Sequence, residues 1–381
     1  MAPSLRLALL LLLGTLLGLA GIDLILPAVP GLPEALGGTP VQAQGVLAAF
    51  SFGTGAGLLL FGALGAAYPA RWLLPLALTL YGAFAFAAAA VTDMPTLLAL
   101  RFFQGLLGAC PAVLAPGLLR ALFPPDQALR ALAAMGSAEA LAPALAPVLG
   151  AALLALGDWR TPFLALGGAA LAVALLTARA GAHLPILSAS PERLAYGELL
   201  RLPRFRALGL AYACALASLL VYVFAMPTLL TQRLGGGLSH FIGMQMAGIL
   251  TFMVAANSAT TLAKRFGHGR VSTFGAGLST GALGLLCGYA ALGGAKLWVY
   301  LLLFLPVNAG LGFRGPLAFF AALDAGQGND ERGSALLLLA VMVLTGGGTL
   351  LAAPTLPAGP LGLTATAFAL ALTGVLAGRR G

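Results

Sequence analysis

Apolar residues follow one another in long runs along this chain, and charged residues, Gly or Pro mark the short breaks between them. A helix that crosses a bilayer needs about 20 mostly apolar residues. Twelve runs are long enough, and each predicts a membrane-spanning helix. They cover residues 7–30, 43–68, 72–92, 96–120, 128–156, 161–180, 206–231, 238–263, 271–293, 296–322, 332–353 and 358–378.

The longest polar interruption lies at residues 181–205 and divides the spans six and six. It holds many of the charges found between spans, whereas the other breaks are short. This layout predicts an all-α membrane protein with two six-helix halves. The expected boundaries are an N-terminal half of residues 1–180, a cytoplasmic linker of residues 181–205 and a C-terminal half of residues 206–381.

Composition excludes a soluble domain. The 381 residues are 60% hydrophobic and 8% charged, whereas soluble domains carry about 25% charged residues. The mean hydropathy is +1.00. The first apolar run also has the features of a cleaved signal peptide, namely one Arg followed by a Leu run. Because eleven more apolar runs follow it, we favour a retained first span.

Basic residues give the orientation. Most of the 20 Lys and Arg residues fall in loops on the side of the N-terminus, whereas the opposite loops hold only Arg160, Arg233 and Lys296. Cytoplasmic loops carry the excess of Lys and Arg, so both termini are predicted to be cytoplasmic. The net charge of +9 is mainly this topology signal. The basic residues form no continuous run, so we expect no nucleic-acid partner.

Four ionisable residues fall inside spans: Asp23, Arg101, Glu139 and Arg314. Such residues are costly in a membrane and mark functional sites by default, although a buried ion pair can also simply fix helix packing. Asp23 and Arg101 are predicted to lie on the same side of the membrane, where they could meet. Burial favours a neutral carboxyl and a guanidinium favours a charged one, so making and breaking this contact would bind and release a proton. Glu139 is the third candidate for proton coupling, with a neutral hydrogen-bonded acid as the alternative.

Several segments resemble one family of transporters. The stretch "GIDLILPAVPGLPEAL" is similar to its end of span 1, and "RFFQGLLGA" matches its R-x-x-Q-G motif with Arg101, Gln104 and Gly105. In "LAPALAPVLGAAL", Pro147 and Gly150 match the G-P-x-x-G-G antiporter motif, and "DWRTPF" resembles the W-R-x-x-F that follows it. The chain resembles the twelve-span drug/proton antiporters of the major facilitator superfamily, specifically the bicyclomycin-resistance type.

Two motifs depart from the family pattern. Between spans 2 and 3, Gly62, Leu64 and Arg71 are kept, but the acid of the motif is replaced by Ala66. The charge contacts that this loop makes in the family are therefore in doubt.

The antiporter motif also has alanines, Ala146 and Ala151, at positions where the family has glycines. Pro143 and Pro147 remove backbone donors and predict a bend in span 5, either for coupling or only for packing. The pairs Gly53/Gly57 and Gly277/Gly281 predict helix-packing faces.

The resemblance implies a secondary active transporter that exports a small, partly apolar compound in exchange for protons by alternating access. An importer of a small organic, possibly anionic, solute is the alternative. The fold would enclose a cavity lined by spans 1, 4, 7 and 10. Tyr212, Tyr222 and Met226 on span 7, and Asn308 and Phe313 on span 10, are the candidate lining residues. Ordinary packing or lipid contact is an equally good interpretation of each.

Arg314 is expected to face the cavity, to pair with Glu139, or to meet an anionic group of the substrate. Two arginines and two acids leave the interior formally neutral, which favours an uncharged or anionic substrate. No hydrolase, metalloprotease, P-loop or dinucleotide motif is present, so neither an enzyme nor an ATP-driven pump is predicted. A channel is less consistent with Pro-bent spans.

The three cysteines lie far apart in apolar runs, without the spacing of a metal site or disulfide. We predict a monomer without cofactor or metal, in a bacterial inner membrane, whose partners are lipid, protons and a small molecule.

Overall fold

The computed structural model of this chain describes residues 3–181, 184–185, 196–327 and 330–379, and nearly all of them are helical. Contacts divide the chain into two units, Met1–Pro191 and Glu192–Gly381. Within the predicted linker 181–205, residues 182–183 and 186–195 lie outside the described residues. The boundaries 1–180, 181–205 and 206–381 therefore stay predictions.

Unit 1 is a bundle of long helices that begin at clear signals. Thr39 caps α3 with a reciprocal hydrogen-bond pair to Gln42, and the Asp93 side chain accepts from the Thr96 N–H at the start of α5. Such caps satisfy N–H groups that a helix start leaves open. The elements are α1 (Pro3–Asp23), η1 (Leu26–Gly31), α2 (Leu32–Leu36), α3 (Pro40–Ala67), α4 (Ala70–Ala90), α5 (Met94–Leu122), α6 (Pro125–Leu156) and α7 (Thr161–Ala180).

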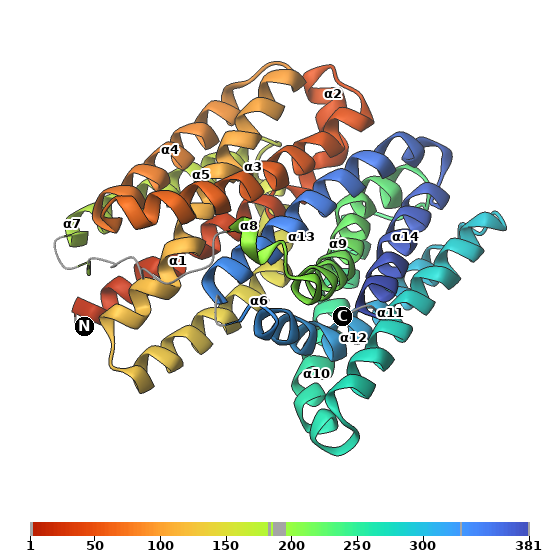
Figure 1. The fold of residues 1–381 in the computed structure, drawn as a ribbon. Coiled ribbons are helices and arrows are strands. Elements are labelled where there is room, and N and C mark those ends of the chain that lie inside the picture. The colour runs from red at the N-terminus through yellow and green to blue at the C-terminus, as the bar shows by residue number, and fades with distance from the viewer. Residues whose placement is uncertain (1–2, 182–183, 186–195, 328–329, 380–381) are drawn as a thin grey trace. The chain divides into compact units, whose positions relative to one another are not determined.

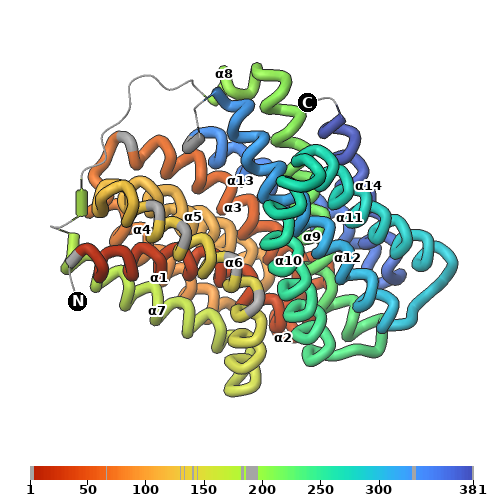
Figure 2. Tube along the Cα trace, turned by 90° about the horizontal axis from the view of Figure 1, so that it is seen from below, coloured from red at the N-terminus to blue at the C-terminus, as the bar shows by residue number. Residues whose placement is uncertain are grey.

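Within unit 1, α5 packs against α1, α3 and α4, as Figure 1 shows. Helix α6 runs along α1 (Figure 2). Gly53 and Gly57 of α3 lie directly against the backbone of α5 at Phe102 and Leu106, so the two helices are in backbone contact. This pair forms the packing face that its spacing predicted.

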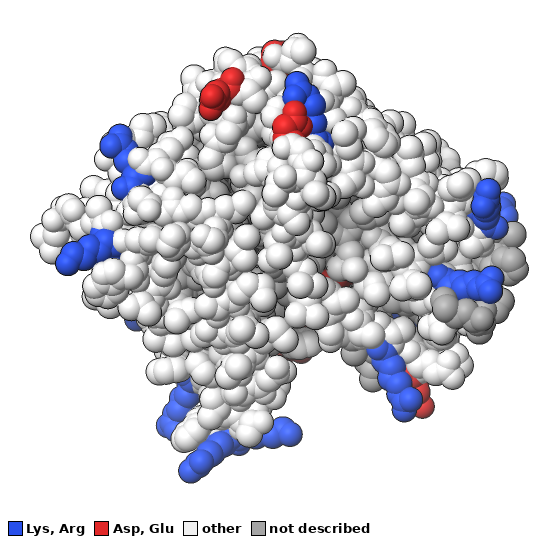
Figure 3. Space-filling view, turned by 180° about the vertical axis from the view of Figure 1, so that it is seen from behind, with Lys and Arg blue, Asp and Glu red and all other residues white. Residues whose placement is uncertain are grey.

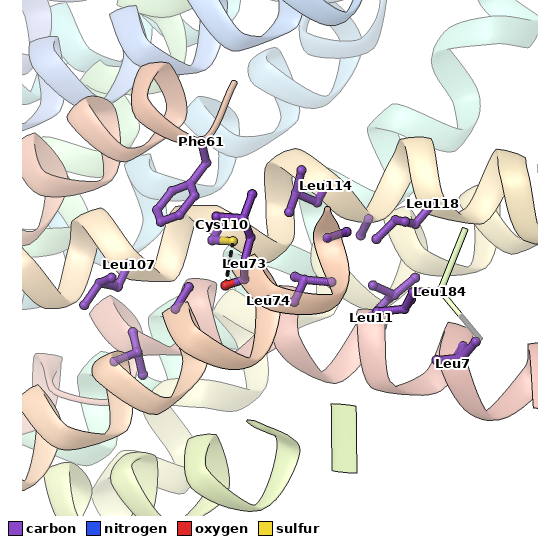
Figure 4. Close-up of a cluster of buried hydrophobic side chains, with 14 of the residues drawn as sticks. Leu7, Leu11, Phe61, Leu73, Leu74, Leu107, Cys110, Leu114, Leu118 and Leu184 are labelled. Atoms are coloured by element: carbon purple, nitrogen blue, oxygen red, sulfur yellow. Dashed lines mark hydrogen bonds between the residues drawn. The ribbon is translucent and has the colours of Figure 1, made fainter. Parts of the chain in front are cut away.

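An apolar cluster fills the space between α1, α3, α4 and α5. Figure 4 shows Leu11, Phe61, Leu74 and Leu114 converging there, with the Cys110 thiol 3.9 Å from the Leu73 carbonyl oxygen that it faces. Cys110 is buried and free. The cluster fixes these four helices against one another, and α1 is therefore an integral part of the bundle.

Unit 2 repeats the pattern of long apolar helices. Helix α9 packs against α12, α13 and α14, and α11 packs against α12 and α14. Gly277 and Gly281 of α11 have no atom within 4 Å of the position of an added Cβ, so the predicted packing face there is wrong for the described residues. The elements are α8 (Tyr196–Leu199), α9 (Pro203–Gln232), α10 (Leu238–Phe266), α11 (His268–Ala291), α12 (Leu297–Asp324), α13 (Asp330–Ala352), η3 (Ala353–Ala358) and α14 (Leu361–Gly378).

The predicted membrane spans are confirmed. Among the described residues, 11 helical segments are long and apolar enough to cross a membrane, and α6 is the twelfth if its two arms form one span. These arms, Pro125–Pro143 and Leu145–Leu156, meet at 47°. Pro143 and Pro147 account for the bend, because neither ring can donate a helical hydrogen bond. Charged side chains are sparse on the face that Figure 3 shows.

Candidate functional site

The Arg101 side chain is fully buried in unit 1, where α5 packs against the end of α1. Its exposed fraction is 0%. One terminal nitrogen, Nη2, donates to the Gly21 carbonyl at 2.8 Å, and Nη1 donates to Gln104 Oε1 at 2.6 Å. The R-x-x-Q-G motif thus places Arg101 and Gln104 one helical turn apart, where Gln104 helps to orient the guanidinium.

The reason for the Gly21 contact lies in how α1 ends. The Ile25 N–H bonds to the Ile22 carbonyl, one residue short of the α-helical partner. The Gly21 carbonyl is therefore left without its helical donor, as carbonyls at helix ends commonly are. A cation at a helix C-terminus also interacts favourably with the helix dipole. Arg101 therefore caps span 1 from a neighbouring helix.

Aromatic rings close the space around this guanidinium. The Arg101 Cζ lies 4.3 Å from the centre of the Phe50 ring on α3 and 5.7 Å from that of Phe163 on α7. Both distances are within the range of cation–π contacts. Tyr81 of α4 donates its hydroxyl to the Leu17 carbonyl of α1 at 3.0 Å. Five helices of unit 1 thus meet at the end of span 1.

Two polar donors inside this cluster are unused. Arg101 Nε and Gln104 Nε2 are buried and have no hydrogen-bond partner among the described residues. Buried donors are normally paired, and leaving one unpaired costs about 1–3 kcal/mol. A further hydrogen-bond acceptor could therefore bind to these donors beside Arg101.

Asp23 is the last residue of α1, and its exposed fraction is 9%. Within the described parts of the chain, no ion pair joins it to Arg101 and no group hydrogen-bonds its carboxyl. The prediction that Asp23 and Arg101 meet is thus wrong for this conformation. Arg101 instead binds the carbonyl two residues earlier, because the end of the helix exposes that carbonyl.

Glu139 lies at a different level of the same bundle. Its side chain lies near that of Thr15, in the middle of α1. The Thr15 hydroxyl donates to the Leu12 carbonyl at 2.8 Å. Thr15 precedes Asp23 by eight residues, which is about 12 Å along a helix. Asp23, Arg101 and Glu139 therefore do not form one cluster.

Gly150 of the antiporter motif contacts the chain immediately after Asp23. A Cβ at this position would overlap the Leu24 carbonyl oxygen and would lie 2.9 Å from the Leu24 carbonyl carbon. Only Gly allows α6 to approach the end of span 1 so closely. Gly105 makes a similar backbone contact with Phe50. Both glycine motifs therefore converge on the region around Asp23 and Arg101.

The residues of "DWRTPF" form local contacts at the start of α7. Asp158 accepts hydrogen bonds from the Arg160 backbone N–H at 2.9 Å and from its guanidinium at 2.8 Å. The backbone contact, aided by the side chain, holds the pKa of Asp158 below its usual value. Trp159 packs edge-on against Phe163 at 6.1 Å. The motif thus leads to Phe163, the ring beside Arg101.

The loop between spans 2 and 3 contains few contacts. Leu64 packs against the apolar cluster, Gly62 is partly buried, and Arg71 is exposed with its Cζ 5.8 Å from the centre of the Trp72 ring. Within the described residues Arg71 forms no ion pair. The structure thus gives no charge contact for the reduced motif.

Arg314 is buried between three helices of unit 2. Its Nη2 donates to the carbonyls of Ala211 on α9 and Gly374 on α14, both at 3.2 Å, and its exposed fraction is 6%. The sequence suggested a cavity position, a pair with Glu139 or a substrate contact. The backbone carbonyls provide a fourth arrangement, in which Arg314 joins α9, α12 and α14.

The other residues predicted to line a cavity divide into two groups. Tyr222, Met226 and Asn308 are buried: Tyr222 donates to the Tyr300 carbonyl at 3.1 Å, and Asn308 donates to the Phe304 carbonyl at 2.8 Å. Tyr212 and Phe313 remain partly exposed. These two rings pack on Phe319 at 5.3 Å and on Phe274 at 5.8 Å, respectively.

Comparison with known proteins gives relatives that are transporters. A bicyclomycin resistance protein homolog of Haemophilus influenzae is 30% identical over 143 residues, which cover 38% of this chain and 36% of that protein. The efflux pump bik6 of Gibberella fujikuroi is 33% identical over 110 residues, 29% of this chain and 23% of that protein. The matched segments thus span well under two thirds of either relative.

The fold is shared with solved transporters. The crystal structure of a D-xylose–proton symporter superimposes with a TM-score of 0.71 at 17% identity, over 99% of this chain and 97% of that one. The family model described as Major Facilitator Superfamily matches residues 11–353, most of the chain. The chain therefore belongs to the Major Facilitator Superfamily and is a multi-pass membrane protein.

Proposed function

We propose that this chain exports small, partly apolar organic compounds in exchange for protons, by alternating access of its two halves. It would work as a monomer in a bacterial inner membrane, with both termini in the cytoplasm. The observation that carries the proposal is the buried, unpartnered Asp23 beside the Arg101 cap of span 1. The partial matches to a bicyclomycin resistance protein homolog and to an efflux pump support the direction of transport.

Asp23 is suited to carry the coupling proton. An acid inside a membrane helix is costly when charged and unpaired, so Asp23 without a partner is best accommodated as a neutral acid. When the proton leaves, Arg101 can serve as the cation, because it already binds the carbonyl of Gly21, two residues before Asp23 in the chain. Arg101 Nε is unused and can accept the new carboxylate as its partner. The site therefore provides for both protonation states.

Exchange of partners at Arg101 would move span 1. If the guanidinium turns to bring Nε to the Asp23 carboxylate, the hydrogen bond from Nη2 to Gly21 would weaken and the end of α1 would be released. Because Gly150 lies against Leu24, α6 would have to follow this movement. The bend of α6 at Pro143 and Pro147 gives that helix a point at which it can do so. Proton release is thereby linked to a rearrangement of spans 1, 4 and 5.

Transport in proteoliposomes tests the proposal. Purified wild-type protein would be reconstituted and given a panel of fluorescent organic compounds, with and without an imposed pH gradient. We expect the gradient to drive compound against the proton flux, and a protonophore to stop it. Accumulation in the same direction as the protons would instead identify an importer, and transport that ignores the gradient would exclude proton coupling.

A further inference from the structure

Three exposed arginines lie at one end of unit 1, where α1 and α4 begin and α7 ends. They are Arg6, Arg71 and Arg179. Each belongs to the first or last turn of a segment that is long and apolar enough to cross a membrane. The three side chains therefore leave the backbone near the level of the lipid headgroups rather than in the bilayer core.

Packing holds these three helix ends together. Leu7 of α1 and Leu184, which follows α7, lie in the same apolar cluster, as Figure 4 shows. At Gly181, the residue directly after α7, an added Cβ would lie 3.5 Å from the Arg71 Cβ. The start of α4 therefore lies against the end of α7.

Arg6 and Arg71 also lie on helix faces that meet. Leu10, one turn after Arg6, packs against a buried cluster that contains Leu78 of α4 and Val173 of α7. Leu78 lies two turns after Arg71, and residues four or seven positions apart share one face of a helix. The two arginines therefore lie at the membrane-surface end of the same contact between α1, α4 and α7.

The described chain offers these arginines no negative partner. Within the described residues, none of the acids of unit 1 forms an ion pair with Arg6, Arg71 or Arg179. These acids are Asp23, the exposed Glu34 of α2, Asp93, Asp126, Glu139 and Asp158. Three positive charges thus gather at one end of the bundle without a counter-charge from the described protein.

The surface next to the arginines is apolar and exposed. Trp72 and Leu76 lie one turn apart on α4, and Leu175 lies one turn before Arg179 on α7. The Arg71 Cζ is 5.8 Å from the centre of the Trp72 ring, and Trp is enriched where a span meets the headgroups. Acyl chains can use this apolar surface, whereas a soluble anion would use only the charges.

We propose that Arg6, Arg71 and Arg179 bind the headgroup of an anionic phospholipid, whose acyl chains lie along α4 and α7. Guanidinium groups bind phosphate oxygens through paired hydrogen bonds, and basic pockets between membrane helices hold anionic headgroups. The lipid supplies the missing counter-charge and joins the start of span 1 to its two neighbours. The inference goes beyond the proposed function, because it depends on neither the direction nor the coupling of transport.

Binding of lipid to the delipidated full chain in neutral detergent tests the proposal. The probes are dioctanoyl phosphatidylglycerol, the zwitterionic dioctanoyl phosphatidylcholine, and glycerol phosphate, which is anionic but has no acyl chains. Native mass spectrometry would give the affinity for each. The variants are Arg6→Gln, Arg71→Gln, Arg179→Gln, their triple combination, and the control Arg204→Gln, which removes an exposed arginine from the first turn of α9 in unit 2.

We expect the wild-type protein to bind phosphatidylglycerol at least about tenfold more tightly than phosphatidylcholine. Each single variant should lose about fivefold in affinity for phosphatidylglycerol, and the triple variant should lose the preference altogether. Unchanged affinity for phosphatidylcholine would show that the variants are folded. Arg204→Gln should change nothing.

Equal affinity of the wild-type protein for the two lipids would overturn the proposal, as would a preference that the triple variant keeps. An equal loss in Arg204→Gln would attribute the preference to general surface charge. Displacement of phosphatidylglycerol by an equal concentration of glycerol phosphate would assign the site to a soluble anion instead. The single variants keep the test decisive if the triple variant fails to fold.

Discussion

Gly150 offers a direct test of how α6 is coupled to the site around Asp23. Substitution by Ala adds a methyl group whose carbon would overlap the Leu24 carbonyl oxygen and lie 2.9 Å from the Leu24 carbonyl carbon. The three nearest atoms all belong to the Leu24 backbone, which cannot rotate away as a side chain can. Helix α6 or the end of span 1 must therefore shift.

The expected cost follows from the overlap. Overpacking of a closely packed contact destabilises a protein by about 1–3 kcal/mol. The higher helix preference of Ala opposes this by about 0.5–1 kcal/mol. We expect a net loss of about 1–2 kcal/mol, which lowers the apparent melting temperature by a few degrees, together with weaker gradient-driven transport.

Gly136→Ala is the matched control, because it makes the same change in the same helix. Gly136 has no atom within 4 Å of the added Cβ. Melting in detergent would be followed by size-exclusion chromatography of heated samples, and transport in proteoliposomes. The reasoning is wrong if Gly150→Ala is as stable and as active as Gly136→Ala.

Three further predictions concern other parts of the structure. Arg101→Lys should lose one of the hydrogen bonds to Gly21 and Gln104, at a cost of about 1.5–3 kcal/mol, and should lower both melting temperature and transport; an unchanged protein would show that the cap is dispensable. Arg314→Met should lower the melting temperature, because it removes the two hydrogen bonds from Nη2 that join α12 to α9 and α14; an unchanged melting temperature together with a transport loss specific to anionic compounds would support the substrate-binding role instead. A topology reporter at the C-terminus should be cytoplasmic and one inserted near residue 235 should be outside, and the reverse result would contradict the proposed orientation.

Sequence patterns were sufficient to predict the positions of the helices, because a membrane span is recognised by its length and its apolar composition. The twelve runs correspond in order to the helices of the structure, and the two mid-span prolines of α6 produce the expected bend. Arg101 and Gln104 were found for a similar reason, since a charge in an apolar run stands out and a known motif contains it.

The partners of these residues could not be predicted in the same way. Arg101 and Arg314 bind backbone carbonyls of Gly21, Ala211 and Gly374, and a carbonyl is present at every position in the chain. Only the three-dimensional course of the helices decides which carbonyl is exposed. Counting charges therefore gave a neutral interior but could not show that both guanidinium groups bind backbone carbonyls.

Some neighbours did leave a signal in the sequence. Phe163 is the last residue of "DWRTPF", and its place in the motif pointed to a role that the structure identifies as packing beside Arg101. Phe50 and Tyr81 left no such signal, because aromatic residues are common in apolar spans.

Proton coupling through Asp23 is the central claim, and comparing two modes of transport in Asp23→Asn tests it most directly. One assay measures export driven by an imposed pH gradient, and the other measures exchange of labelled for unlabelled compound without a gradient. Exchange requires binding and alternating access but no net proton movement. We predict that Asp23→Asn loses gradient-driven export and keeps exchange, whereas Glu34→Gln keeps both. Gradient-driven export by Asp23→Asn at the wild-type rate would contradict the claim.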